Sequence, residues 1–94
     1  MHKNHPIVTT AKLRALVKKN EIGYVDRTRR QISSMTNGVA ISQLGSDIYV
    51  EGFGFNDQIV IAQNIAKFDE ALASLGLTLT KLNDSDYKVV KVGA

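Results

Sequence analysis

Basic side chains cluster in the first third of the 94-residue chain, where Lys18-Lys19 is followed shortly by Arg27-x-Arg29-Arg30. Guanidinium groups make bidentate contacts with phosphate, and proteins that bind nucleic acid concentrate such charge on one face. The candidate nucleic-acid-binding residues are therefore Lys12, Arg14, Lys18, Lys19, Arg27, Arg29 and Arg30. The alternative interpretation is a solvated surface that only keeps the protein soluble.

The charge is distributed unevenly along the chain. Residues 1–30 carry eight Lys and Arg against two acids, a net charge of +6, whereas residues 31–94 carry four Lys against seven acids, a net charge of −3. Such asymmetry is typical of a protein with a polyanion-binding end. A helix-turn-helix is disfavoured, because Lys18 and Lys19 occupy positions, counted back from Gly23, where that motif needs small or apolar residues. We therefore expect contacts to the nucleic-acid backbone with little base readout.

A second candidate contact consists of the aromatic pair Phe53 and Phe55 in Gly52-Phe53-Gly54-Phe55. The glycines are similar to those of a phosphate-binding loop, but the third Gly and the Lys-Ser/Thr ending are missing, and a hairpin turn accounts for both. In a strand, the two rings would point to the same face, where they would form core, a stacking platform for bases or a partner-binding patch. Burial in the core is the commonest of these outcomes for Phe.

Groups suited to catalysis or metal binding are scarce. The chain has no cysteine, and its two histidines, His2 and His5, lie near the N-terminus without a third ligand beside them. The acidic residues fall mostly in predicted turns or on an exposed helix face, where carboxylates are solvated; the seven of residues 31–94 are Asp47, Glu51, Asp57, Asp69, Glu70, Asp84 and Asp86. We therefore expect no enzyme activity, no cofactor and no metal site.

The composition is that of a single globular domain, with 44% hydrophobic and 22% charged residues. We expect residues 1–8 to form a flexible N-terminal arm and residues 9–94 one α+β domain. The sequence contains neither an apolar run of the roughly 18 to 20 residues that span a bilayer nor the apolar segment of a signal peptide. These features favour a cytoplasmic protein without a membrane partner.

Apolar spacing predicts a helix over residues 10–20, because Leu13, Leu16 and Val17 recur at intervals of three and one. Asp26 is suited to cap a second short helix over residues 27–36. The alternative is a strand that begins within Ile22-Gly23-Tyr24-Val25.

In the second half, alternating apolar residues predict a hairpin of strands 39–43 and 47–53, and a C-terminal hairpin of strands 77–81 and 87–92. A helix over residues 63–75 is predicted to end at Gly76. The segment 58–62 fits either a third strand or the beginning of this helix.

These elements predict a two-layer α+β fold, in which a small antiparallel sheet of two hairpins, with four or five strands, is covered on one face by two to three helices. The expected core consists of Leu13, Leu16, Val17, Ile32, Ile41, Ile48, Val50, Ile65, Phe68, Leu72, Leu75, Leu79 and Val89.

The predicted function is that of a small non-enzymatic binding protein, an accessory or regulatory protein of the kind encoded by phages and mobile elements, which contacts the DNA or RNA backbone through its basic N-terminal helical surface. The alternative is a protein-binding adaptor or inhibitor whose partner presents an acidic or apolar surface. Homodimerisation through the C-terminal hairpin or an edge strand is also expected.

Overall fold

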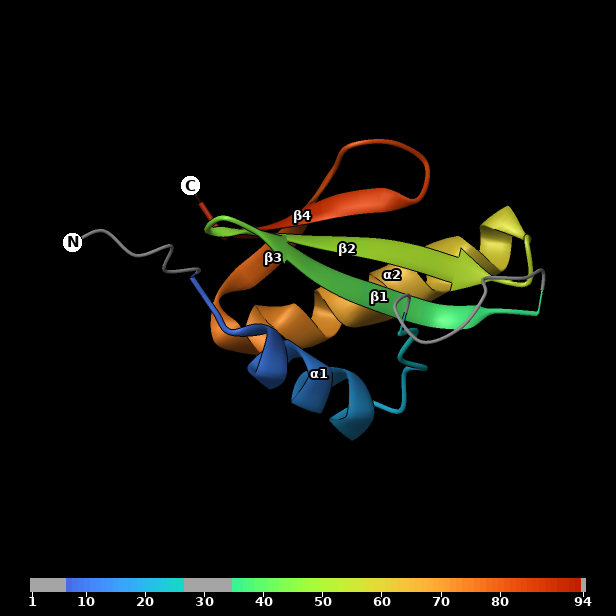
Figure 1. Cartoon of the computed structure of the whole chain (residues 1–94), viewed down its shortest axis with the longest axis horizontal. Coiled ribbons are helices and arrows are strands. Elements are labelled where there is room, and N and C mark those ends of the chain that lie inside the picture. The colour runs from blue at the N-terminus through green and yellow to red at the C-terminus, as the bar shows by residue number, and fades with distance from the viewer. Residues whose placement is uncertain (1–6, 27–34, 94) are drawn as a thin grey trace.

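The computed structural model describes residues 7–26 and 35–93, and its elements form a small α+β fold with a four-stranded antiparallel sheet and two α-helices (Figure 1). In chain order the elements are α1 (Thr10–Lys19), β1 (Asn37–Leu44), β2 (Asp47–Gly54), α2 (Gln58–Leu72), the short 3-10 helix η1 (Ala73–Leu75), β3 (Leu77–Lys81) and β4 (Asp86–Lys91). The predicted helix over 27–36 lies outside the described residues except for its last two positions.

The sheet has the strand order β1-β2-β4-β3, so both predicted hairpins are confirmed, and β2 and β4 join them side by side. The segment after α1 runs along the free side of β1, where Tyr24 forms a parallel bridge with Val39. The Val25 N–H donates to the Val39 carbonyl, and the Val39 N–H donates to the Gly23 carbonyl, both at 2.8 Å. Residues 23–25 therefore lie extended against β1 in an isolated bridge and not in a strand, and the helix predicted over 27–36 stays a prediction.

Helix α1 begins and ends as the sequence predicts. The Thr9 hydroxyl accepts a hydrogen bond from the Lys12 N–H at 3.1 Å, which satisfies one of the unpaired donors of the first turn. At the other end, the side-chain amide of Asn20 donates to the Leu16 carbonyl at 2.8 Å. Leu13 and Val17 are fully buried, so the helix presents one apolar stripe to the sheet.

Helix α2 resolves the ambiguity at residues 58–62 in favour of helix. It begins at Gln58, immediately after Asp57, whose carboxylate accepts from the Ile59 N–H at 2.9 Å. Ile61, Ile65 and residues farther along the same stripe face the sheet, so helical spacing outweighs the β-branched composition of this segment. The predicted end is confirmed, since Gly76 adopts a left-handed φ of 72° after η1.

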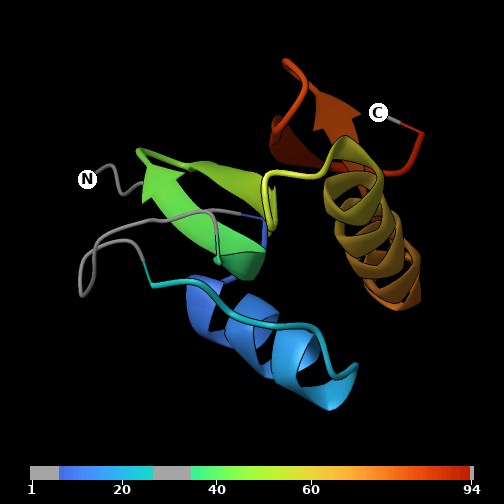
Figure 2. The same cartoon turned by 90° about the vertical axis from the view of Figure 1, so that its right-hand side faces the viewer.

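One core lies between the sheet and the helices, which lie on the same side of it (Figures 1 and 2). Eight of the predicted core residues are buried: Leu13, Val17, Ile48, Val50, Ile65, Phe68, Leu72 and Val89. Leu16, Ile41, Leu75 and Leu79 are partly buried, and Ile32 lies outside the described residues. The core also contains Val8, Ile22, Val39 and Leu77, which the sequence analysis did not select. Val8, which was assigned to the flexible arm, is only 8% exposed.

Asp69 of α2 binds the edge strand β3. Its Oδ1 atom accepts hydrogen bonds from the Thr78 hydroxyl at 2.8 Å and from the Leu79 N–H at 3.0 Å. The expectation that this carboxylate is merely solvated on an exposed helix face is wrong, because Asp69 is half-buried and faces β3. Strand β3 is the last strand of the sheet, and an edge strand can pair with another chain through its free backbone N–H groups. The Asp69 carboxylate already accepts from one of these groups, the Leu79 N–H.

We expect Asp69→Ala to lower the free energy of unfolding by about 1–2 kcal/mol, because it leaves two donors without their charged acceptor. The neighbouring Glu70→Ala is the matched control, since Glu70 is exposed. Urea denaturation of both variants checks this, and equal losses in the two would contradict the role of Asp69.

Candidate nucleic-acid interface

Helix α1 carries four of the seven predicted cationic site residues. Lys12, Arg14, Lys18 and Lys19 are all exposed, and none of the ten residues of α1 is acidic. Lys18 and Lys19 lie in the last turn, where the negative end of the helix dipole favours cations. The local fold therefore brings these four charges together on one element and tolerates them there.

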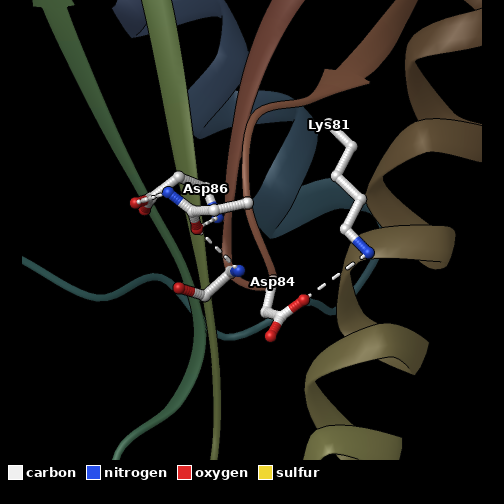
Figure 3. Close-up of polar contacts among 5 residues, drawn as sticks. Lys81, Asp84 and Asp86 are labelled. Carbon is white, nitrogen blue, oxygen red and sulfur yellow. Dashed lines mark hydrogen bonds and ion pairs between the residues drawn. The ribbon is translucent and has the colours of Figure 1, made fainter.

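The α1 cations also lack carboxylate partners within the described ranges 7–26 and 35–93. Lysines of the sheet differ in this respect: Lys88 Nζ lies 3.4 Å from an Asp47 carboxylate oxygen, and Lys81 Nζ lies 3.8 Å from Asp84 (Figure 3). Within the part of the chain that the structure describes, no ion pair neutralises the positive charge of α1.

Arg14 is held in place by an aromatic ring. Its guanidinium carbon lies 5.6 Å from the centroid of the Tyr24 ring, within the range of a cation–π interaction. Tyr24 is itself fixed by the bridge to Val39 in β1. The bridge fixes the backbone of Tyr24, and the contact with its ring favours one position of the Arg14 guanidinium.

The other three predicted cations, Arg27, Arg29 and Arg30, lie outside the described residues. Their contribution to a basic surface stays a prediction. The candidate interface is therefore defined by the four exposed cations of α1 and by Tyr24 beside them; we call it the α1 basic face.

The aromatic pair is not core. Phe53 is half-buried in β2, and Phe55 is 47% exposed beyond the end of that strand. Phe55 also has a positive φ of 56°, so the regular alternation that would direct both rings to the same face does not continue through it. Core burial, the commonest outcome for Phe, is therefore not the one observed for this pair, and a role in partner contact stays a prediction.

Gly52 and Gly54 are not hairpin-turn residues, as the sequence suggested, but strand residues that face α2. A Cβ atom at Gly54 would lie 2.7 Å from the backbone nitrogen of Ile61, and one at Gly52 would lie 2.8 Å from the Ile65 side chain. The two glycines let the helix approach the sheet closely. This packing role explains them without a phosphate.

Sequence analysis missed a pocket of about 280 Å³ on the sheet face opposite the core, lined by Ala40, Ser42, Tyr49, Val50, Glu51, Leu82, Asn83 and Asp86. Glu51 and Asp86 are direct cross-strand partners of β2 and β4. Asp86 Oδ2 accepts from the Asn83 side-chain amide at 2.8 Å, within the turn drawn in Figure 3. The Asn83 side-chain oxygen accepts in turn from the backbone N–H groups of Ser85 and Asp86, at 3.0 and 2.9 Å. These contacts assign Asn83 and Asp86 to the stability of the β3–β4 turn.

None of the family models, curated proteins or solved structures compared with this chain matches it. No helix within residues 7–26 and 35–93 combines the length and apolar character that a membrane crossing requires.

Proposed function

We propose that this protein binds the phosphate backbone of nucleic acid through the α1 basic face, as a small cytoplasmic accessory or regulatory protein. The observation that carries the proposal is the set of four exposed α1 cations without a carboxylate partner among the described residues. Unpaired cations gathered on one helix bind a polyanion without first breaking an internal ion pair.

Counterion release favours binding of a polyanion to these cations. Each phosphate that a Lys or Arg neutralises frees condensed cations, so affinity falls with salt by about 0.9 logarithmic units per contact for duplex DNA. Four contacts from α1 correspond to a slope of roughly −3.6. Arg27, Arg29 and Arg30 extend this slope if they join the same surface.

The test is binding to labelled double-stranded DNA, single-stranded DNA and RNA across a salt series, with the variant Lys12→Ala/Arg14→Ala/Lys18→Ala/Lys19→Ala alongside. We expect binding at micromolar concentrations near physiological salt and a steep salt dependence, both lost in the variant. Alanine is a strong helix former, so the variant should keep the fold, which circular dichroism checks.

The control variant removes the same number of positive charges from outside α1. Its targets are the four Lys of residues 31–94, which are Lys67, Lys81, Lys88 and Lys91. Their replacement by Ala should leave most of the affinity. Equal losses in both quadruple variants would reduce the effect to net charge, and absence of binding to all three nucleic acids would refute the proposal. The triple variant Arg27→Ala/Arg29→Ala/Arg30→Ala then measures the contribution of those arginines.

A second candidate function is protein binding through an apolar surface. Phe55 is 47% exposed, and its N–H donates to the Thr36 carbonyl at 2.9 Å, which places it next to the segment that carries Met35, 74% exposed. Ile59, 69% exposed, follows in the first turn of α2. A protein partner bound here would be released by Phe55→Ala and would be nearly indifferent to salt, in contrast to a nucleic acid.

A further inference from the structure

The positions of the α1 cations around the helix are more informative than their number. Successive residues of an α-helix are rotated by about 100°, so each side chain of α1 can be assigned to a direction relative to the buried Leu13 and Val17. Arg14 and Lys18 lie on one flank of the exposed surface, and Lys12 and Lys19 lie on the other.

Between the two flanks lies a crest of small side chains. Ala11 and Ala15 point away from Leu13 and Val17 by the same rotation, and both are exposed. At about 100° per residue, Lys18 lies roughly 20° from Ala11 and Lys19 roughly 40° from Ala15, so the cations border these alanines directly on both sides.

We infer that, if the proposed function holds, the polyanion is B-form double-stranded DNA, with α1 lying in the major groove and its two flanks contacting the phosphates of opposite strands. A helix with its side chains is about 10–12 Å wide, and the major groove of B-DNA is about 12 Å wide. The alanine crest lets the helix backbone approach the base edges and gives them little hydrogen bonding, so the binding is weakly sequence-specific.

The placement of α1 in the molecule fits this mode. Figure 2 shows α1 at the outside of the fold on its side of the sheet, with its buried Leu13 and Val17 in the same core cluster as Phe68 of α2. Its ten residues span about 15 Å. The element can therefore enter a groove while the sheet and α2 remain outside.

Other nucleic acids fit less well. The major groove of A-form RNA is deep and narrow and does not admit a helix. Proteins that bind single strands without sequence preference use aromatic rings on which bases stack. The crest of α1 has none, and Tyr24 beside it is covered on one face by Arg14.

The decisive experiment compares the two flanks on one DNA duplex. Lys12→Ala/Lys19→Ala and Arg14→Ala/Lys18→Ala should each lower the affinity at least tenfold and reduce the salt slope by about 2, one for each lost phosphate contact. The charge-matched control is Lys67→Ala/Lys91→Ala, which removes two exposed lysines outside α1. Methyl green, which occupies the major groove, should compete with the protein, and netropsin, which fills the minor groove, should not. An RNA duplex of the same sequence should bind at least tenfold more weakly.

The outcomes separate this inference from the proposed function. Loss of affinity in only one flank variant, competition by netropsin alone, or equal affinity for the RNA duplex would overturn the groove assignment while leaving backbone binding intact. Binding that no α1 variant weakens would overturn both.

Discussion

Replacing Gly38 by Ala should lower the free energy of unfolding by about 2–4 kcal/mol, one of the largest losses expected from adding a single methyl group to this protein. Gly38 lies in β1 with a φ of 135°, which L side chains rarely adopt. A Cβ atom there would also collide with the backbone carbonyl of Gly23. The strain and the collision both involve main chain, so rotation of a side chain relieves neither.

The control separates the two contributions. Gly45, in the turn between β1 and β2, also has a positive φ of 64°, but a Cβ atom there meets nothing within 4 Å. Gly45→Ala should therefore show only the cost of the backbone conformation, about 1 kcal/mol. Urea denaturation with linear extrapolation measures both variants. Similar losses at Gly38 and Gly45 would mean that the contact with Gly23 contributes nothing.

This contact also bears on the candidate interface. The approach of Gly23 to Gly38 brings residues 22–25 alongside β1, and the bridge from Tyr24 to Val39 follows from it. Tyr24 in turn lies beneath Arg14. The geometry of one flank of the α1 basic face therefore depends on two glycines that are 15 residues apart in the sequence and carry no charge.

Elements with a strong local signal could be predicted from the sequence. Thr9, Asn20 and the stripe around Leu13 define α1, and Gly76 ends the helical segment before β3. The two hairpins follow from alternation of apolar and polar residues. The exposure of the α1 cations also follows from helical periodicity, which is why the described part of the predicted site is presented to solvent.

Features that depend on contacts between distant segments could not be predicted. Asp69 meets Thr78 and Leu79 only after the edge strand has folded back against α2, and its sequence neighbourhood resembles that of a solvated carboxylate. The segment 58–62 fitted both a third strand and the beginning of a helix, and the packing of Ile61 against the sheet selects the helix. The direction of the Phe55 ring depends on its positive φ, a backbone conformation that is more typical of Gly or Asn than of Phe.

Substitution of Gly54, one of the two β2 glycines that pack against α2, should give the other large loss of stability. Gly54→Ala should lower the free energy of unfolding by about 3 kcal/mol, and Gly52→Ala by about 1 kcal/mol. The difference comes from what each new methyl group meets. At Gly54 it would lie 2.7 Å from the Ile61 backbone nitrogen and 2.9 Å from the Val60 carbonyl carbon, so the first turn of α2 must move. At Gly52 its nearest neighbours are side-chain atoms of Ile65, at 2.8 and 3.0 Å, which can rotate away.

Thermal and urea unfolding of the two variants, with wild type, test this order. Because Asp57 caps α2 directly after this contact, a displaced first turn should also weaken the cap, and amide hydrogen exchange at Ile61 should rise in Gly54→Ala more than in Gly52→Ala. A loss at Gly54 no larger than that at Gly52 would mean that α2 retreats from β2 at little cost. The glycines would then lack the packing role assigned here.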